Sequence, residues 1–363
     1  MTVEIRPIAL PARDAAPDAS WAELEAYAAL VRRLDVETLG TGDLARRPAE
    51  LLVSLTDRED RAHVALGAFD AGALVGLAEV VWELDVDATT AFVSMLGVEP
   101  ERRREGIGSR LLAEAERVAV AAEHPTTVLS ADHLLAHDDG GGERLHAPQG
   151  GASLPAGLGV VRFALAHGYA LGQLDRVSAL DLDGRADGFR RRLAELEASV
   201  PPSAARYRIE TWIDRAPDDL VDSLAVAHER MSVDAPSGAI SYEFEPWDAA
   251  RVRHDEGRSL ASGRTSLVAA AVASDGEVAG FTQLSLLAES PAVEQWDTIV
   301  LAPHRGHRLG LRLKLANLVL LADTDPARNR VYTWNADENA HMLAINDALG
   351  FTPFALESQW QRT

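Results

Sequence analysis

The sequence lacks several residues on which common enzyme chemistries depend. It has 363 residues, no cysteine and a single lysine, Lys314. The absence of cysteine excludes a thiol nucleophile, a disulfide framework and a cysteine-ligated zinc site, and we expect no bound metal. Because the chain has one lysine and no Gly-Lys-Ser or Gly-Lys-Thr sequence, neither a Schiff-base lysine nor a Walker-type phosphate loop is expected.

Long apolar runs and targeting patterns are also missing. The longest apolar stretches, 267–273 and 315–322, are too short to cross a bilayer. The first residues, Met-Thr-Val-Glu-Ile-Arg-Pro, show no charged and apolar targeting pattern. We therefore expect a cytoplasmic protein that has no membrane partner.

Positive charge is scarce relative to negative charge, with 35 Lys and Arg against 56 Asp and Glu and a net charge of -21. This balance disfavours nucleic acid as a partner, because phosphate binding needs an excess of basic residues. An acidic field attracts cationic ligands such as amines, although it equally serves solubility alone. The 47% of hydrophobic and 25% of charged residues are typical of a globular protein, and the length favours two domains.

The same order of expected elements occurs twice along the chain. Hydrophobic periodicity predicts, in the first half, strands at 3–8, 63–69, 74–82, 90–98, 126–131 and from 169, and helices at 21–33, 49–55, 107–118 and 160–167. In the second half it predicts strands at 207–212, 266–273, 278–287, 296–301, 330–334 and 351–359, and helices at 218–231, 247–261, 309–322 and 338–349. Asp70-Ala71-Gly72 and Ser274-Asp275-Gly276 are typical of hairpin turns.

Two pairs of residues give the repeat distance. Arg103 corresponds to Arg305 and Gly108 to Gly310, and both pairs are 202 positions apart, since 305 − 103 and 310 − 108 are equal. A duplicated domain is the simplest explanation. We predict domains at 1–200 and 205–363, with a polar helix at 188–198 and a stiff linker at 201–204. The predicted fold class is α/β of the α+β type: two tandem domains, each a mixed twisted sheet flanked by helices.

A loop rich in arginine and glycine, 98–109, joins a predicted strand to a predicted helix. Gly106 and Gly108 allow a tight turn with exposed N–H groups, and the helix start offers unpaired donors and a positive dipole end. Arg103 and Arg104 would add charge-assisted hydrogen bonds. These features suit a diphosphate, whereas a helix cap with solvated arginines is the alternative.

The run Arg103-x-x-Gly106-x-Gly108, which follows Val-x-Pro and precedes Leu-Leu, resembles the acyl-CoA diphosphate signature of the GNAT superfamily of N-acetyltransferases. The order of elements resembles that family over essentially the whole chain, twice. The resemblance implies that acetyl-CoA is the cofactor and that it lies where a neighbouring strand splays away from the fourth strand. In the first half it implies these cofactor-binding residues: Leu96, Val98, Arg103, Arg104, Gly106, Ile107, Gly108 and Ser109. A dinucleotide site fits less well, because the loop follows the fourth strand and lacks a third glycine.

The second half resembles the same signature with one departure. Arg308 stands where the family usually has glycine, so its side chain would block the diphosphate, point outward or reach a phosphate. Asn339 opens the next helix at a position from which the family's asparagine often faces the cofactor, and a first-turn polar residue is the alternative. The cofactor-binding residues implied in this half are Val300, Arg305, Gly306, His307, Arg308, Leu309, Gly310 and Asn339.

The resemblance also implies direct attack of an amine on the thioester, with a base, an acid and backbone N–H groups that stabilise the oxyanion. Where the family often has a tyrosine acid, this chain has Asn346 and Ala164, so another group supplies the proton, the thiolate leaves unassisted or one copy has lost chemistry. Asp297 on the fourth strand is the first choice of base, with a structural carboxylate as the alternative, whereas the first half offers only Ser94. The predicted catalytic residues are Asp297 and Asn346.

Carboxylates between the early helices of the second half are candidates for binding a cationic amine, with solvated loop charges as the alternative; they are Asp234, Glu243, Glu245 and Asp248. Trp296 and Trp334 occupy strand positions and are expected in the core. We expect an acetyl-CoA-dependent N-acetyltransferase that acts on a small-molecule or protein amine, as a monomer or homodimer. The alternative is an acyl-CoA-binding regulatory or scaffold protein in which one or both copies do not turn over.

Overall fold

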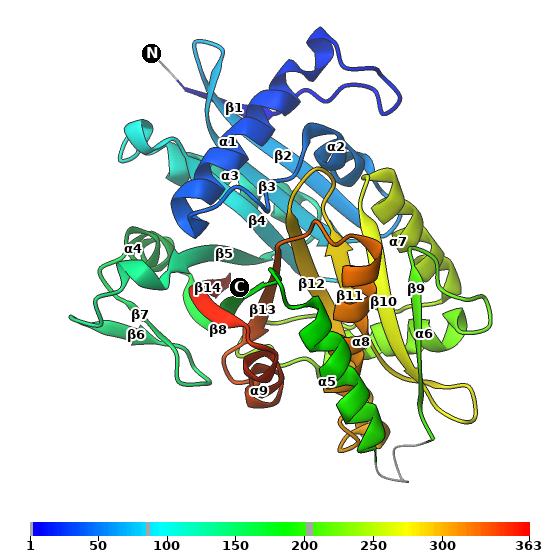
Figure 1. Cartoon of the computed structure of the whole chain (residues 1–363). Helices are drawn as coiled ribbons and strands as arrows, with labels where there is room; N and C mark the ends of the chain where they lie inside the picture. Colours follow the sequence, from blue (N-terminus) through cyan, green and yellow to red (C-terminus); the bar gives the residue numbers. More distant parts are fainter. Residues whose placement is uncertain (1–2, 85–87, 201–205) are drawn as a thin grey trace.

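The computed structural model describes residues 3–84, 88–200 and 206–363 (Figure 1). The elements of the first half are β1 (Glu4–Pro7), α1 (Ala22–Leu39), α2 (Pro48–Thr56), β2 (Arg61–Asp70), β3 (Ala73–Glu83), β4 (Thr90–Val98), α3 (Ile107–Ala121), β5 (Thr126–Leu134), β6 (Arg144–His146), β7 (Ser153–Pro155), α4 (Gly159–Ala166), β8 (Ala170–Asp181) and α5 (Ala186–Ala198). Those of the second half are β9 (Arg208–Ile213), α6 (Val221–Asp234), α7 (Ala249–Ala261), β10 (Thr265–Val272), β11 (Val278–Leu286), β12 (Ala292–Val300), α8 (Leu309–Thr324), β13 (Arg330–Ala336), α9 (Ala340–Leu349) and β14 (Thr352–Arg362). The predicted linker lies outside the described residues.

The strands of the two halves join in one 12-stranded sheet of order β1-β2-β3-β4-β5-β14-β8-β13-β12-β11-β10-β9. At its centre the halves exchange strands, because β14 pairs with β5 of the first half and β8 pairs with β13 of the second. In Figure 1 the red β14 accordingly lies beside the green β8. The predicted fold class is confirmed, but the joining of the two sheets was not predicted. The domain limits 1–200 and 205–363 remain a prediction, and each of these segments places its last strand in the other's sheet.

Helices cover both faces of this sheet. One face carries α3 and α4 over the first half and α5, α8 and α9 over the second. The other face carries α1, α2, α6 and α7, and α2 contacts α7 across the junction of the halves. On β13 the alternation is visible directly, since Asn335 contacts α9 and Trp334 packs with Leu39 of α1. The described helices include none that is both long and apolar enough to cross a membrane.

The fourth strand of each half separates from its neighbour after a short paired stretch. β4 pairs with β5 at residues 90–93 and 126–129, and β12 pairs with β13 at residues 292–295 and 330–333. The ladder with the preceding strand is interrupted at the same level, between Val93 and Met95 in β4 and between Gln295 and Thr298 in β12. A bulge bends its strand and re-aims the side chains. The splayed strands that the family resemblance implied are therefore present in both halves.

Most predicted elements have the expected type, and the differences are local. Ala71 and Gly72 both have positive φ (48° and 88°), as the predicted hairpin turn between β2 and β3 requires. Between β5 and α4, where no strand was predicted, the chain forms the β6–β7 hairpin. β12 begins four residues earlier than predicted, at Ala292 rather than Trp296.

Candidate functional site

A cavity of about 1490 Å³ opens beside the splayed ends of β12 and β13. On one side of the sheet it reaches the start of α8 and the groove between α8 and α9; on the other it reaches α6, the 235–248 loop and the first half. Pockets for single small molecules measure roughly 300–1,000 Å³. The volume therefore suits two ligands that meet through the gap between the strands.

The loop before α8 provides the features of an anion site. Gly306 and Arg308 adopt left-handed conformations (φ 85° and 58°), as Arg104 and Gly106 do in the first half (φ 69° and 81°). The two loops thus follow the same backbone path, although glycine and arginine exchange places. No side-chain cap is present at the start of α8 among the described residues, so the first-turn N–H groups are available to a ligand.

The predicted loop arginines are held in the same way in both halves. Arg305 Nε donates to the Val300 carbonyl (3.0 Å), and its guanidinium pairs with Asp234 (2.8 Å). Arg103 Nε donates to the Val98 carbonyl (3.1 Å), and its guanidinium pairs with Glu37 (2.6 Å). A bound diphosphate would compete with these carboxylates for each arginine.

The other predicted cofactor residues of the second half divide into two groups. Those that line the cavity are Val300, Arg305, Gly306, Arg308, Leu309, Gly310 and Asn339. Arg308 is exposed there, and its guanidinium makes no hydrogen bond or ion pair with any described residue, so its charge is available to a ligand. Asn339 also caps α9, since its Oδ1 accepts from Met342 N (3.2 Å). His307 does not line the cavity; its Nδ1 donates to the His304 carbonyl (3.1 Å).

The first-half residues that were predicted to bind the cofactor surround the start of α3, away from this cavity. Ser109 Oγ is bonded to His167 Nε2 (3.0 Å), and the His167 ring packs on Phe163 (4.3 Å between centroids). A Cβ at Gly108 would touch Phe163 at 3.6 Å. Side chains thus approach both helix starts closely, since a Cβ at Gly310 would lie 3.0 Å from Ile345 Cδ1.

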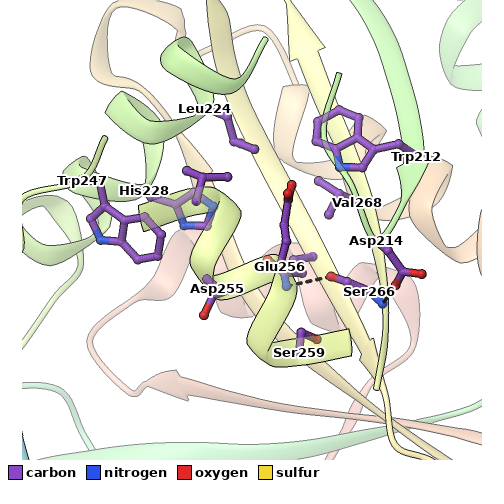
Figure 2. Close-up of a pocket in the computed structure, with 12 residues that line it drawn as sticks. Trp212, Asp214, Leu224, His228, Trp247, Asp255, Glu256, Ser259, Ser266 and Val268 are labelled. Atoms are coloured by element: carbon purple, nitrogen blue, oxygen red, sulfur yellow. Dashed lines mark hydrogen bonds between the residues drawn. The ribbon is translucent and has the colours of Figure 1, made fainter. Parts of the chain in front are cut away.

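Asp297 lies in the cavity on the bulged part of β12, and its Oδ2 is 3.5 Å from His228 Nδ1 of α6. The carboxylate is partly exposed, whereas the imidazole is buried. The His228 ring stacks on Trp247 with a centroid separation of 4.4 Å, and the two side chains are neighbours in Figure 2. A base that is held by a second group in this way resembles the pairs that enzymes use for proton transfer.

Behind His228 is a second, much smaller cavity of about 20 Å³ (Figure 2), which has room for about one water molecule. Its polar wall includes Asp255, Glu256 and Ser259, and the Ser259 hydroxyl has no hydrogen-bond partner in the described parts of the chain. His228 lines both cavities. The imidazole therefore separates the large cavity from a polar site that accommodates water.

Asn346, the second predicted catalytic residue, lies outside the cavity wall. It is buried on α9, where its Nδ2 donates to Asn335 Oδ1 (2.6 Å). Asn335 itself lines the cavity. The amide of Asn346 has no proton to give near neutral pH, so this position supplies hydrogen bonding rather than an acid.

Lys314 lines the cavity from the second turn of α8, with 1% of its surface exposed. Its ammonium makes no hydrogen bond or ion pair with any described residue and lies 5.8 Å from the Phe351 ring centroid. By contrast, Arg312 on the same helix pairs with Glu197 (2.8 Å), and Arg264 pairs with Glu50 (2.6 Å). Burial lowers the pKa of Lys314 to about 7. Lys314 thus places a buried amine that has no partner among the described residues on the wall of the cavity.

The first half forms the wall opposite α8 and contributes Asp57, Asp60, Arg61, His63, Gln173 and Asp175. The 235–248 loop is fastened to it, because Glu243 accepts from Thr89 N (2.6 Å) and Tyr242 stacks on Phe92 (5.7 Å). Of the predicted acceptor-binding carboxylates, Asp234, Glu243 and Glu245 line the cavity. Asp248 instead caps α7 by accepting from Arg251 N (2.8 Å).

Trp296 was expected in the core, and this was wrong. It is 39% exposed and lines the cavity, as does the half-buried Trp334. Other cavity residues were missed altogether, above all His228, Lys314, Gln173 and Asp175. Lys314 had a sequence signal, because a lone lysine interrupts an apolar helix. His228 had none, because its partner Asp297 is brought to it only by tertiary packing.

The fold defines the chain as a tandem-domain protein of the GNAT fold. Residues 27–137, within the first half, match the profile of the family described as "Acetyltransferase (GNAT) family". No curated protein matches the sequence.

Solved structures show the same fold over the whole length of the chain. A tandem GNAT protein from the clavulanic acid biosynthesis pathway, determined without AcCoA, is 26% identical; the match covers 99% of this chain and 98% of that one, with a TM-score of 0.69. A GCN5-related N-acetyltransferase from Sphaerobacter thermophilus is 16% identical, with coverages of 97% and 96% and a TM-score of 0.57. The N-myristoyltransferase of Saccharomyces cerevisiae, with bound MyristoylCoA, is 10% identical, with coverages of 99% and 82% and a TM-score of 0.58.

Proposed function

We propose that the protein is an acyl-CoA-dependent N-acyltransferase that uses acetyl-CoA and that the second half performs the transfer. The family match and the tandem GNAT fold support the general class of acyltransferase. The large cavity supports the choice of half, because it joins an anion-binding helix start to an acidic pocket through the gap between β12 and β13. That continuity is the observation on which the proposal rests.

The residues around the start of α8 fit a diphosphate group. The uncapped N–H groups of α8, the free charge of Arg308 and the guanidinium of Arg305 converge on one end of the cavity. Lys314 adds a buried ammonium further along the same groove. Bound acetyl-CoA would supply the acyl group as a thioester.

The pair of Asp297 and His228 is proposed as the base that removes a proton from the amine. Both side chains face the cavity, and they lie at the bulge of β12, where the regular ladder is interrupted. The bulge redirects backbone groups of Trp296 and Asp297 out of the sheet, so we assign stabilisation of the oxyanion to this segment. The water-sized cavity behind His228 offers the proton a way out of the site.

The acceptor is proposed to be a cationic amine. Five carboxylates on the face opposite α8, namely Asp57, Asp60, Asp175, Glu243 and Glu245, line the cavity. Because they come from both halves, neither half alone forms the acceptor pocket. A net charge of -21 would further attract a positively charged substrate.

Calorimetric titration with acetyl-CoA, followed by measurement of thiol release with a panel of amines, tests the proposal. We expect saturable binding and amine-dependent release of CoA. Binding without release for every amine would instead favour the acyl-CoA-binding regulatory or scaffold protein, an alternative that draws support from the missing acid at Asn346. Failure to bind acetyl-CoA at millimolar concentration would contradict both functions.

A further inference from the structure

Asp175 of β8 places a carboxylate on the cavity wall without a cationic partner. It is 7% exposed, and its two oxygens accept from Gln173 Nε2 (2.6 Å) and Gln359 Nε2 (2.9 Å). It forms no ion pair with any described residue. Several other cavity carboxylates do form ion pairs, for example Asp234 with Arg305 (2.8 Å) and Glu245 with Arg251 (3.6 Å). The charge of Asp175 is therefore held in place by neutral amides only.

A second observation at the same place concerns Gln173. Its side chain lines the cavity and is 4% exposed, and no described residue donates a hydrogen bond to its Oε1. Because its Nε2 donates to Asp175, the Oε1 is the atom of this amide that remains available for another hydrogen bond. A buried acceptor without a donor is unfavourable, and a ligand that brings N–H groups would satisfy it.

The neighbouring strands place two further carboxylates beside Asp175. Glu357 of β14 is directly opposite both Asp175 of β8 and Asp132 of β5, so three carboxylates lie in one row across the exchanged strands. Burial raises the pKa of Asp175 to about 6 and that of Asp132 to about 7, and burial with the adjacent carboxylates raises the pKa of Glu357 well above its usual range. A cation bound in the cavity beside Asp175 would favour the charged form of this carboxylate.

We propose that Asp175 and Gln173 bind a second cationic nitrogen of the acceptor, which makes the substrate a diamine or polyamine rather than a monoamine. This inference depends on the proposed acyl transfer in the second half. An ammonium donates to both the carboxylate of Asp175 and the free oxygen of Gln173, which is the combination of groups that the wall presents.

The sheet order sets the separation of the two nitrogens. β8 is separated from β12 by β13 alone, and neighbouring strands lie about 4.8 Å apart, so Asp175 is at least about 10 Å from the Asp297 strand. The splaying of β12 from β13 can only lengthen this distance. A long, flexible diamine spans it, whereas a short diamine does not. The first half thus selects the substrate and the second half acylates it.

The test compares octanediamine with octylamine, which share a chain length and differ in the second nitrogen. We expect kcat/KM to be about tenfold or more higher for the diamine, as the gain of one charged hydrogen bond implies. Asp175→Asn, which removes the charge and keeps an acceptor for one of the two glutamine amides, should abolish this preference by lowering kcat/KM for octanediamine to about that for octylamine. Glu243→Gln, a matched change at another cavity carboxylate that lacks an ion pair, should keep the preference.

Other results would overturn the assignment. Equal kcat/KM for both amines in the wild-type chain would do so, as would an equal loss of preference in Asp175→Asn and Glu243→Gln. If Asp175→Asn does not fold, Gln173→Met, which removes the free acceptor, serves as the test and should lower the preference for octanediamine. An unchanged preference in Gln173→Met would contradict the proposed site. If no amine releases CoA, the proposed function fails, and calorimetry of octanediamine against octylamine still tests the site through its dependence on Asp175.

Discussion

The two halves share a backbone but differ in what occupies the space beside the splayed strands. In the second half, three residues (337–339) join β13 to α9, and a cavity borders β12. In the first half, a longer segment (135–158) joins β5 to α4, and its apolar residues belong to the same core cluster as Leu96 and Val98 of β4. Gly97 of β4 is also covered closely, because a Cβ there would overlap Leu34 of α1. In the first half, apolar side chains of the protein itself pack against β4. The equivalent strand of the second half, β12, borders the cavity instead.

The comparison extends to single positions. Lys314 corresponds to Leu112, which is fully buried in the first-half core. The bulge of β12 carries Asp297, whereas the bulge of β4 contains only Ser94. Duplication therefore left the loop and strand geometry intact, while charged groups face the cavity in one copy and apolar groups fill the other. The first half contributes instead a wall of the second half's cavity.

We expect the largest effect from separating the two halves. Expressed alone, residues 1–200 lack β14, so β5 and β8 lose their shared partner in the centre of the sheet. We expect this segment to aggregate or to lack cooperative unfolding, because it exposes long unpaired strand edges. Co-expression with residues 205–363 should restore a soluble complex, as judged by co-purification and a single thermal transition. A cooperatively folded monomer of 1–200 would show that the exchange is dispensable.

Blocking the two helix starts in turn would show which one serves catalysis. A Cβ at Gly310 lies 3.0 Å from Ile345 Cδ1, so an indole there must project into the cavity. We expect Gly310→Trp to reduce turnover on the order of a thousandfold, about 4 kcal/mol in the activation barrier. Gly108→Trp is the matched control and should retain most of the amine-dependent thiol release. Equal losses in both variants would mean that transfer does not belong to the second half alone.

A third comparison concerns the bulged strands. Asp297→Asn removes the proposed base while preserving shape, so kcat should fall about a hundredfold or more, with little change in the KM for acetyl-CoA. Ser94→Ala at the bulge of β4 should leave kcat within about twofold. Steady-state kinetics across pH would check this, and wild-type activity in Asp297→Asn at every pH would remove Asp297 from the base role.

The smallest effect is expected from converting Lys314 into its first-half counterpart. Lys314→Leu removes a buried, unpaired ammonium, so the free energy of unfolding should rise by about 1–4 kcal/mol at pH 6. The folded chain lowers the pKa of Lys314 from its usual 10.5 to about 7, so the folded state binds fewer protons between these values. The destabilisation of the folded state by the buried charge of Lys314 is therefore complete below pH 7 and decreases to zero as the pH rises towards 10.5.

Denaturant unfolding at several pH values would show this trend as a stabilisation by Lys314→Leu that shrinks as the pH rises. Leu112→Met in the first half is the control and should give a difference that is independent of pH. A constant difference for Lys314→Leu would mean that packing, rather than charge, determines its effect. The same variant should bind acetyl-CoA more weakly.

Much of the fold was predictable because its signals are local. The 202-residue repeat, the turn at Ala71 and Gly72, and the strand Thr90–Val98 all follow from short patterns, and the structure confirms them. Strand pairing is different: nothing in the sequence of β14 indicates that its neighbours are β5 and β8. For the same reason the loop arginines could be placed from the motif, whereas His228 and Asp175 could not, because tertiary packing alone brings them to the cavity.

The position of β14 has a consequence for how this chain is made. It is the last described strand in chain order, yet it fills the middle of the sheet between strands that were synthesised far earlier. The edges of β5 and β8 that pair with β14 therefore remain unpaired until β14 has been synthesised. Folding of the first half therefore finishes only after the second half exists, which makes slow, chaperone-dependent maturation an expected property of this arrangement.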